Sequence, residues 1–119
     1  MAKIKSIKQS FKEAFNGFRE TLIKETSFKI MLVIAAVALF FLFYFPTSRE
    51  EKAVIFAVIL GVLVLELINS TVEKIMDFID PDYNNKIRII KDLMAAIVLL
   101  ASIGAVIVGI LIFYPYIIS

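Results

Sequence analysis

The chain has 119 residues, a net charge of +2 and 61% hydrophobic residues, with a mean hydropathy of +0.90. That content is far above what the core of a water-soluble domain of this length needs, so the composition predicts one membrane-embedded domain over residues 1–119. Cysteine and histidine are absent, which excludes zinc sites, disulfides, thiol nucleophiles and histidine acid–base chemistry. The small net charge gives no indication of nucleic-acid binding.

The first segment, residues 3–24, places apolar side chains at steps of three and four and leaves its lysines largely elsewhere. The apolar positions are Ile4, Ile7, Phe11, Phe15, Phe18 and Leu22. This spacing predicts an amphipathic helix. Its aromatic face and basic remainder suit a helix in the membrane surface, and the alternative is a helix that packs on a partner protein.

Three apolar stretches follow, each long enough to cross a bilayer. The three spans are predicted over residues 28–45, 52–79 and 87–114. Pro46 stops the first span, and Ser48 with Glu51 has the spacing of a capping box that opens the second helix. Asp80 before Pro81 ends that helix. The predicted fold is therefore all-α: an amphipathic surface helix followed by three transmembrane helices.

The basic residues predict the orientation in the membrane. Of 13 Lys and Arg residues, seven precede Ile30, four lie between Lys74 and Lys91, two lie between the first two spans, and none follows the third. Cytoplasmic loops carry the excess of basic residues in membrane proteins. We therefore expect the N-terminal helix and the loop at 80–92 to be cytoplasmic and the C-terminus to lie outside.

The inner half of the second span carries a polar stripe. Its members are Glu66, Asn69, Glu73 and Asp77, at steps of three, four and four, which puts them on one face of a helix. Glu66 should lie near the headgroup level of the cytoplasmic leaflet. Because a carboxylate at that depth is costly, Glu66 is a candidate general base for a hydroxyl at the interface. The alternative is a helix-packing role for Asn69 with Glu66 protonated.

Two further carboxylates are candidate Mg²⁺ ligands: Glu73, and Glu25 at the junction of the first two helices. Hard cations take oxygen ligands, and Mg²⁺ usually takes one or two carboxylates plus substrate phosphates. Lys91 can reach the same layer and neutralise phosphate charge. The competing class is a non-enzymatic transport or assembly protein that uses Glu66 as an ion or proton site. Residues 53–65 carry no polar side chain, so no polar path crosses the bilayer, which favours interfacial chemistry.

These residues also carry a resemblance to a known family. The segment Glu66-Leu67-Ile68-Asn69-Ser70-Thr71-Val72-Glu73-Lys74-Ile75-Met76-Asp77, followed about fourteen residues later by Lys91-Asp92, resembles the prokaryotic diacylglycerol kinase family, which includes the undecaprenol kinases of Gram-positive bacteria. Residues 15–19 and 25–29 are similar to the surface helix of the family and its start of the first span. The resemblance therefore covers nearly the whole chain.

The resemblance implies an ATP-dependent lipid kinase that phosphorylates a membrane lipid alcohol, undecaprenol or diacylglycerol. Its likeness to the shorter Gram-positive type favours undecaprenol. It implies that Glu66 is the general base and that Glu25 and Glu73 bind the Mg²⁺ of MgATP. The residues that it implies for the nucleotide site are Asn69, Asp77, Lys91 and Asp92.

The resemblance further implies a homotrimer in the bacterial inner membrane. A stripe of small residues, Ala101, Ala105 and Gly109, would let another helix approach closely. The sequence has no glycine-rich phosphate-binding loop of the Walker type, so ATP is expected to be held in another way.

Overall fold

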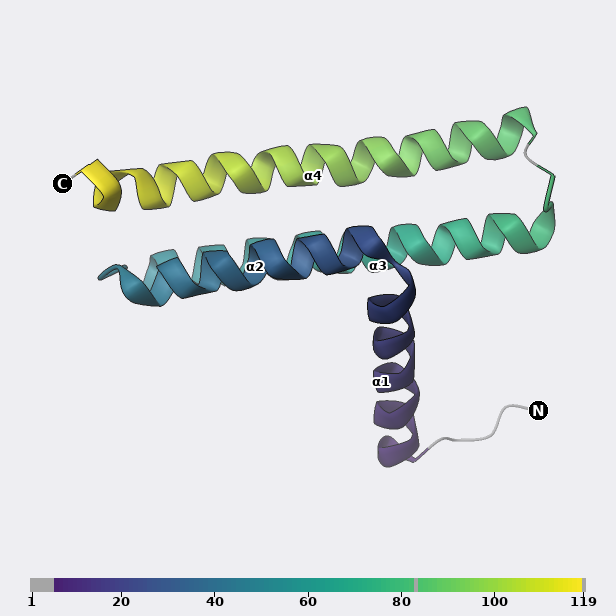
Figure 1. Cartoon of the computed structure of the whole chain (residues 1–119), viewed down its shortest axis with the longest axis horizontal. Helices are drawn as coiled ribbons and strands as arrows, with labels where there is room; N and C mark the ends of the chain where they lie inside the picture. Colours follow the sequence, from purple (N-terminus) through teal and green to yellow (C-terminus); the bar gives the residue numbers. More distant parts are fainter. Residues whose placement is uncertain (1–5, 83, 119) are drawn as a thin grey trace.

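The structure, a computed structural model, describes residues 6–82 and 84–118. The four helices within them are α1 (Ile7–Lys24), α2 (Thr26–Tyr44), α3 (Arg49–Ile79) and α4 (Asn85–Ile118). The helices α2, α3 and α4 lie side by side, and α1 meets the start of α2 at a steep angle and points away from α4 (Figure 1). The all-α prediction and its three apolar helices are confirmed. Residues 3–5 of the predicted first helix lie outside the described residues.

The capping box predicted before the second span is present. Ser48 accepts a hydrogen bond from the backbone of Glu51, and the Glu51 side chain accepts one from the backbone of Ser48, which completes the predicted capping box. The helix α3 therefore begins at Arg49, slightly before the predicted start of the second span. It ends at Ile79, before Asp80 and Pro81, as expected.

The last helix continues beyond the predicted end of the third span at residue 114. It runs through Pro115 to Ile118. A proline this close to the end of a helix removes only one backbone donor. Next to this end, the ring of Tyr116 stacks on Phe45 at 5.7 Å, and Phe113 lies 6.3 Å from the same ring. These aromatic contacts hold the end of α4 against the turn between α2 and α3.

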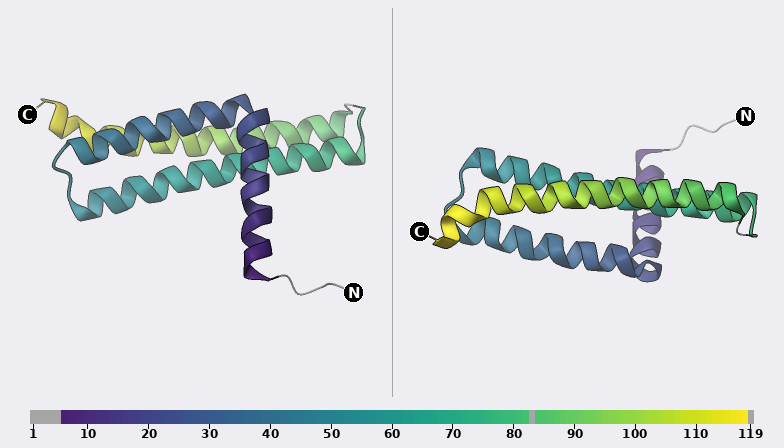
Figure 2. Two further views of the ribbon diagram at one scale, coloured as in Figure 1. Left: turned by 60° about the horizontal axis from the view of Figure 1, so that its bottom comes forward. Right: turned by 90° about the horizontal axis from the view of Figure 1, so that it is seen from above.

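The three long helices differ in length. The 19 residues of α2 span about 28 Å, close to the hydrocarbon core of a bilayer at about 30 Å. The 31 residues of α3 and 34 of α4 span about 46 and 51 Å. Two turned views show α3 and α4 continuing side by side past α1 (Figure 2). The ends that pass α1 are therefore the polar part of α3 and the charged start of α4.

Most large apolar side chains of the three long helices are exposed in the single chain, among them Phe40, Leu100 and Leu111. The buried apolar core is small, and its fully enclosed large side chains are Phe28 and Leu42. Apolar surface of this extent is covered by lipid or by other protein surfaces. Together with the three apolar helices, this surface makes the chain a membrane protein.

Candidate functional site

The polar stripe of α3 runs from a buried position to an exposed one. Glu66 is 4% exposed, Asn69 and Glu73 are half-buried, and Asp77 is exposed. The helical repeat places the four on one face. The helix α2 lies along the first half of α3 only (Figure 1), and Ser27 at the start of α2 contacts Glu66, so the residues after Glu66 lie increasingly beyond its cover. The stripe therefore connects the inside of the helix bundle with the end that projects past α1.

Glu66 receives a hydrogen bond from a different helix. The hydroxyl of Ser27, in the first turn of α2, donates to Glu66 Oε1 at 2.8 Å. Sequence reasoning did not identify Ser27 as part of the site. A signal was present, because a buried carboxylate needs a donor and Ser27 directly follows the junction where α2 begins. This bond links the polar stripe to the start of the first span.

Three of the predicted nucleotide residues, Asp77, Lys91 and Asp92, make ion pairs, and two of the three pair with each other. Lys91 of α4 contacts Asp77 of α3 at 2.9 Å, with side chains 24% and 65% exposed. Asp92 instead accepts from Arg88, one turn earlier on α4, at 3.1 Å. The structure thus brings Asp77 and Lys91 together across the two helices. The contact that it gives Asp92 lies along α4 itself.

The two predicted metal ligands sit on different elements. Glu25 is the single residue between α1 and α2, half-buried, and its side chain makes no capping hydrogen bond to α2. Glu73 receives a long hydrogen bond, 3.5 Å, from the amide of Asn69. Within the described residues, no three His, Cys, Asp or Glu side chains gather closely enough to hold a metal ion alone. A metal at this site would therefore need ligands from a bound substrate or another chain.

The helix α1 is amphipathic, and its end packs on the start of α2. Phe18 packs edge-to-face on the buried Phe28 of α2, with ring centroids 5.4 Å apart. On the charged face, the ammonium of Lys24 donates to Glu20 at 2.7 Å and holds the pKa of Glu20 below its usual value. The charge of Lys74 on α3 adds to that lowering. The end of α1 therefore lies near the polar stripe of α3.

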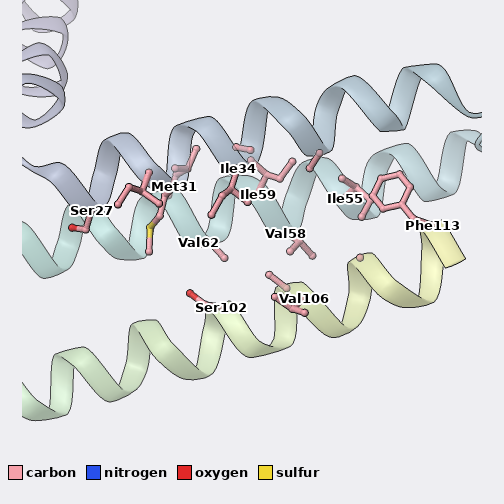
Figure 3. Close-up of a pocket in the computed structure, with 16 residues that line it drawn as sticks. Ser27, Met31, Ile34, Ile55, Val58, Ile59, Val62, Ser102, Val106 and Phe113 are labelled. Carbon is pink, nitrogen blue, oxygen red and sulfur yellow. The ribbon is translucent and has the colours of Figure 1, made fainter. Parts of the chain in front are cut away.

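An apolar cavity of about 400 Å³ opens between α2, α3 and α4. Its wall includes Ile34 of α2, Ile59 of α3 and Val106 of α4 (Figure 3). Phe113 lies at the end next to the turn between α2 and α3, and Ser27 lies at the end next to α1 (Figure 3). The side chain that donates to Glu66 is thus also part of the cavity wall.

These features define a class of protein: a helical membrane protein with a buried carboxylate beside an apolar cavity and charged side chains at one end of the bundle. Comparison with known families makes the class specific. Residues 12–113 match the family described as prokaryotic diacylglycerol kinase. The chain belongs to this family, which is a family of lipid kinases, and the resemblance found in the sequence is confirmed.

A relative in Bacillus subtilis (strain 168) is named undecaprenol kinase. It is 32% identical to this chain over 107 residues, which cover 90% of this chain and 87% of the relative. The similarity therefore extends over all three long helices and is not confined to the polar stripe.

Proposed function

We propose that this protein transfers the γ-phosphoryl group of ATP to the hydroxyl of a membrane lipid alcohol, undecaprenol or diacylglycerol, at the cytoplasmic interface. The observation that carries the proposal is the buried carboxylate of Glu66, hydrogen-bonded to a serine that lines an apolar cavity. An apolar cavity suits a lipid chain, and the Ser27–Glu66 pair marks its polar end. Undecaprenol is the favoured substrate because the Bacillus subtilis relative is named for it.

Glu66 acts as the general base in this proposal. Its carboxylate takes the proton of the lipid hydroxyl while the hydroxyl oxygen forms a bond to the γ-phosphorus. The bond from the γ-phosphorus to its bridging oxygen breaks, and ADP leaves with the electron pair. A protein interior excludes water from the attack, which agrees with the low exposure of Glu66. The lipid phosphate and ADP are the products.

The second substrate is MgATP, and Glu25 and Glu73 are the proposed Mg²⁺ ligands. Neither carboxylate is committed to a short hydrogen bond in the described part of the chain, and two carboxylates plus phosphate oxygens suit Mg²⁺. The ion would neutralise phosphate charge as the γ-phosphoryl group moves. The proposed nucleotide contacts are Asn69, Asp77, Lys91 and Asp92. The positively charged Lys91 side chain would contact the phosphates as well as Asp77.

We propose that α1 lies in the cytoplasmic surface of a bacterial inner membrane, with the N-terminus inside and the C-terminus outside. The excess of basic residues lies in α1 and at the adjoining ends of α3 and α4. The exposed aromatic side chains Phe11 and Phe15 of α1 suit the headgroup layer. The polar ends of α3 and α4 would then reach the compartment that holds ATP.

We also propose a homotrimer. The exposed apolar side chains of α2 and α4 offer surface for other copies, and a residue as small as Gly109 allows close helix approach. A side chain added at Gly109 would meet nothing within 4 Å in the single chain. Because Gly109 also lines the apolar cavity, this open space belongs to the cavity, and the support for a homotrimer is the exposed apolar surface of α2 and α4.

The test is transfer of phosphate from labelled ATP, with Mg²⁺, to undecaprenol and to diacylglycerol in parallel, using purified protein in mixed micelles. The two lipids are supplied at the same mole fraction, and we expect undecaprenol to be labelled faster than diacylglycerol. Labelling of diacylglycerol alone would reverse the preference. Labelling of neither lipid by a folded oligomer would overturn the proposed activity and favour a non-enzymatic role for Glu66.

A further inference from the structure

We propose that Ser27 is a positioning residue for Glu66, an inference that rests on the proposed kinase activity. Its hydroxyl donates to Oε1 of Glu66 at 2.8 Å. With Oε1 held, Oε2 is the oxygen left to take the proton of the lipid hydroxyl. Ser27 itself does not touch the reacting atoms in this arrangement and acts through the carboxylate.

The need for such a residue follows from the Glu66 side chain. A glutamate has three rotatable bonds, and a proton acceptor must stay within hydrogen-bond reach of the proton that it takes. Within the described part of the chain, Ser27 is the donor to this carboxylate. The bond joins α3 to α2, so it fixes the side chain relative to a second helix and not only to its own.

The position of Ser27 in α2 adds a second effect. It lies two residues after Glu25, the proposed Mg²⁺ ligand, at the first turn of the helix. Glu25 is the N-cap position of α2 and Ser27 lies in its first turn. The start of one helix therefore carries both a carboxylate for MgATP and the donor that holds the base. We infer that this turn sets the base relative to the phosphoryl group.

The cavity supplies a matched control. Ser27 and Ser102 both line it, Ser27 from α2 and Ser102 from α4 (Figure 3). The Ser27 hydroxyl donates to Glu66. No hydrogen bond joins Ser102 to a carboxylate among the described residues. Replacing either serine by alanine removes one hydroxyl from the same cavity, but only one replacement removes the bond to Glu66.

The experiment measures kcat and both KM values of the purified oligomer in mixed micelles. We expect Ser27→Ala to lower kcat by about tenfold, the scale of one hydrogen bond to a charged group, with both KM values unchanged. Ser27→Thr keeps the hydroxyl and should recover most of kcat. Ser27→Cys, close in volume but with a weak donor, should behave like alanine. Ser102→Ala removes a hydroxyl from the same cavity but leaves the bond to Glu66, so its effect should be confined to the lipid KM, with kcat retained.

A double-mutant cycle separates positioning from packing. In the Glu66→Gln background, Ser27→Ala should leave the residual rate unchanged, because the base that it positions is gone. An active wild type with an unchanged kcat in Ser27→Ala would overturn this inference and leave the kinase intact. An equal loss in Ser27→Thr, or a further loss in the Glu66→Gln background, would also overturn it. A wild type that labels neither lipid is the separate failure of the proposed function.

Discussion

Two of the carboxylates of α3, Glu51 in its first turn and Glu66 near its middle, are held differently. Glu51 accepts hydrogen bonds from the backbone of Ser48 and from the hydroxyl of Tyr116. Both hydrogen bonds stabilise the fold: the bond from Ser48 caps α3, and the bond from Tyr116 joins α4 to α3. Glu66, deeper in the bundle, is almost fully buried and accepts one hydrogen bond, from Ser27.

The difference shows how burial and hydrogen bonding divide roles between like side chains. A carboxylate has two oxygens and can accept about four hydrogen bonds. Glu51 is half-exposed, so water can satisfy what the protein does not. Glu66 is shielded from water, and its unused acceptor capacity is what a proton-accepting group needs. Glu66 is therefore suited to accepting a proton, and Glu51 to stabilising the fold.

The largest effect is expected from the same substitution at the two carboxylates. Glu66→Gln keeps the shape but removes the base, so turnover should fall by about 10² to 10⁴-fold. Glu51→Gln keeps an acceptor oxygen for its partners and should retain turnover near the wild-type rate. Phosphate transfer to lipid in micelles measures both, with size-exclusion chromatography to check the oligomer. Equal rates for the two variants would remove the distinction between the carboxylates.

A smaller effect is expected at the edge of the inner site. Glu73→Ala removes a proposed Mg²⁺ ligand, so the Mg²⁺ concentration for half-maximal rate should rise by about tenfold, the scale of a lost charged contact. A titration of rate against Mg²⁺ at fixed ATP measures it. Asp92→Ala removes a carboxylate that is a proposed nucleotide contact and not a proposed Mg²⁺ ligand, and that contacts Arg88, so it should leave the Mg²⁺ requirement unchanged. An unchanged Mg²⁺ requirement in Glu73→Ala would argue against metal ligation by this residue.

The smallest effect on turnover is expected at the start of α3. Ser48→Ala removes the N-cap of α3 and should cost about 1 kcal/mol of stability, seen as a lower thermal midpoint of the purified protein. Turnover at a temperature where the protein is folded should stay unchanged, because this end holds structure. Ser48→Asn, which keeps a capping oxygen, should restore most of the midpoint. An equally lowered thermal midpoint in both variants would point to a role for Ser48 other than capping.

Much of the fold could be predicted from the sequence, because the signals are local. The apolar runs, the capping box at Ser48 and the stop before Pro81 each involve neighbouring residues of one helix. The stripe from Glu66 to Asp77 is likewise a matter of helical repeat within one segment. The family also follows from these residues, and the match over 12–113 confirms it.

The partners of the site residues could not be predicted in the same way. The spacing in α3 does not say that Glu66 meets Ser27 or that Asp77 meets Lys91. Such pairs depend on which faces of two helices meet and at what depth. The roles of Glu25, Glu73 and Asp92 remain predictions, and the Mg²⁺ titration above addresses Glu73.

The sequence by itself determined the all-helical membrane class, the ends of α3 and the polar stripe, since each depends on the order of residues along one helix. The tertiary structure decided that a serine of α2 holds the buried carboxylate of α3, that an apolar cavity ends at this serine, and that α4 continues through Pro115. The physical reason is that contacts between helices depend on how their side chains pack, and packing is a property of the assembled bundle.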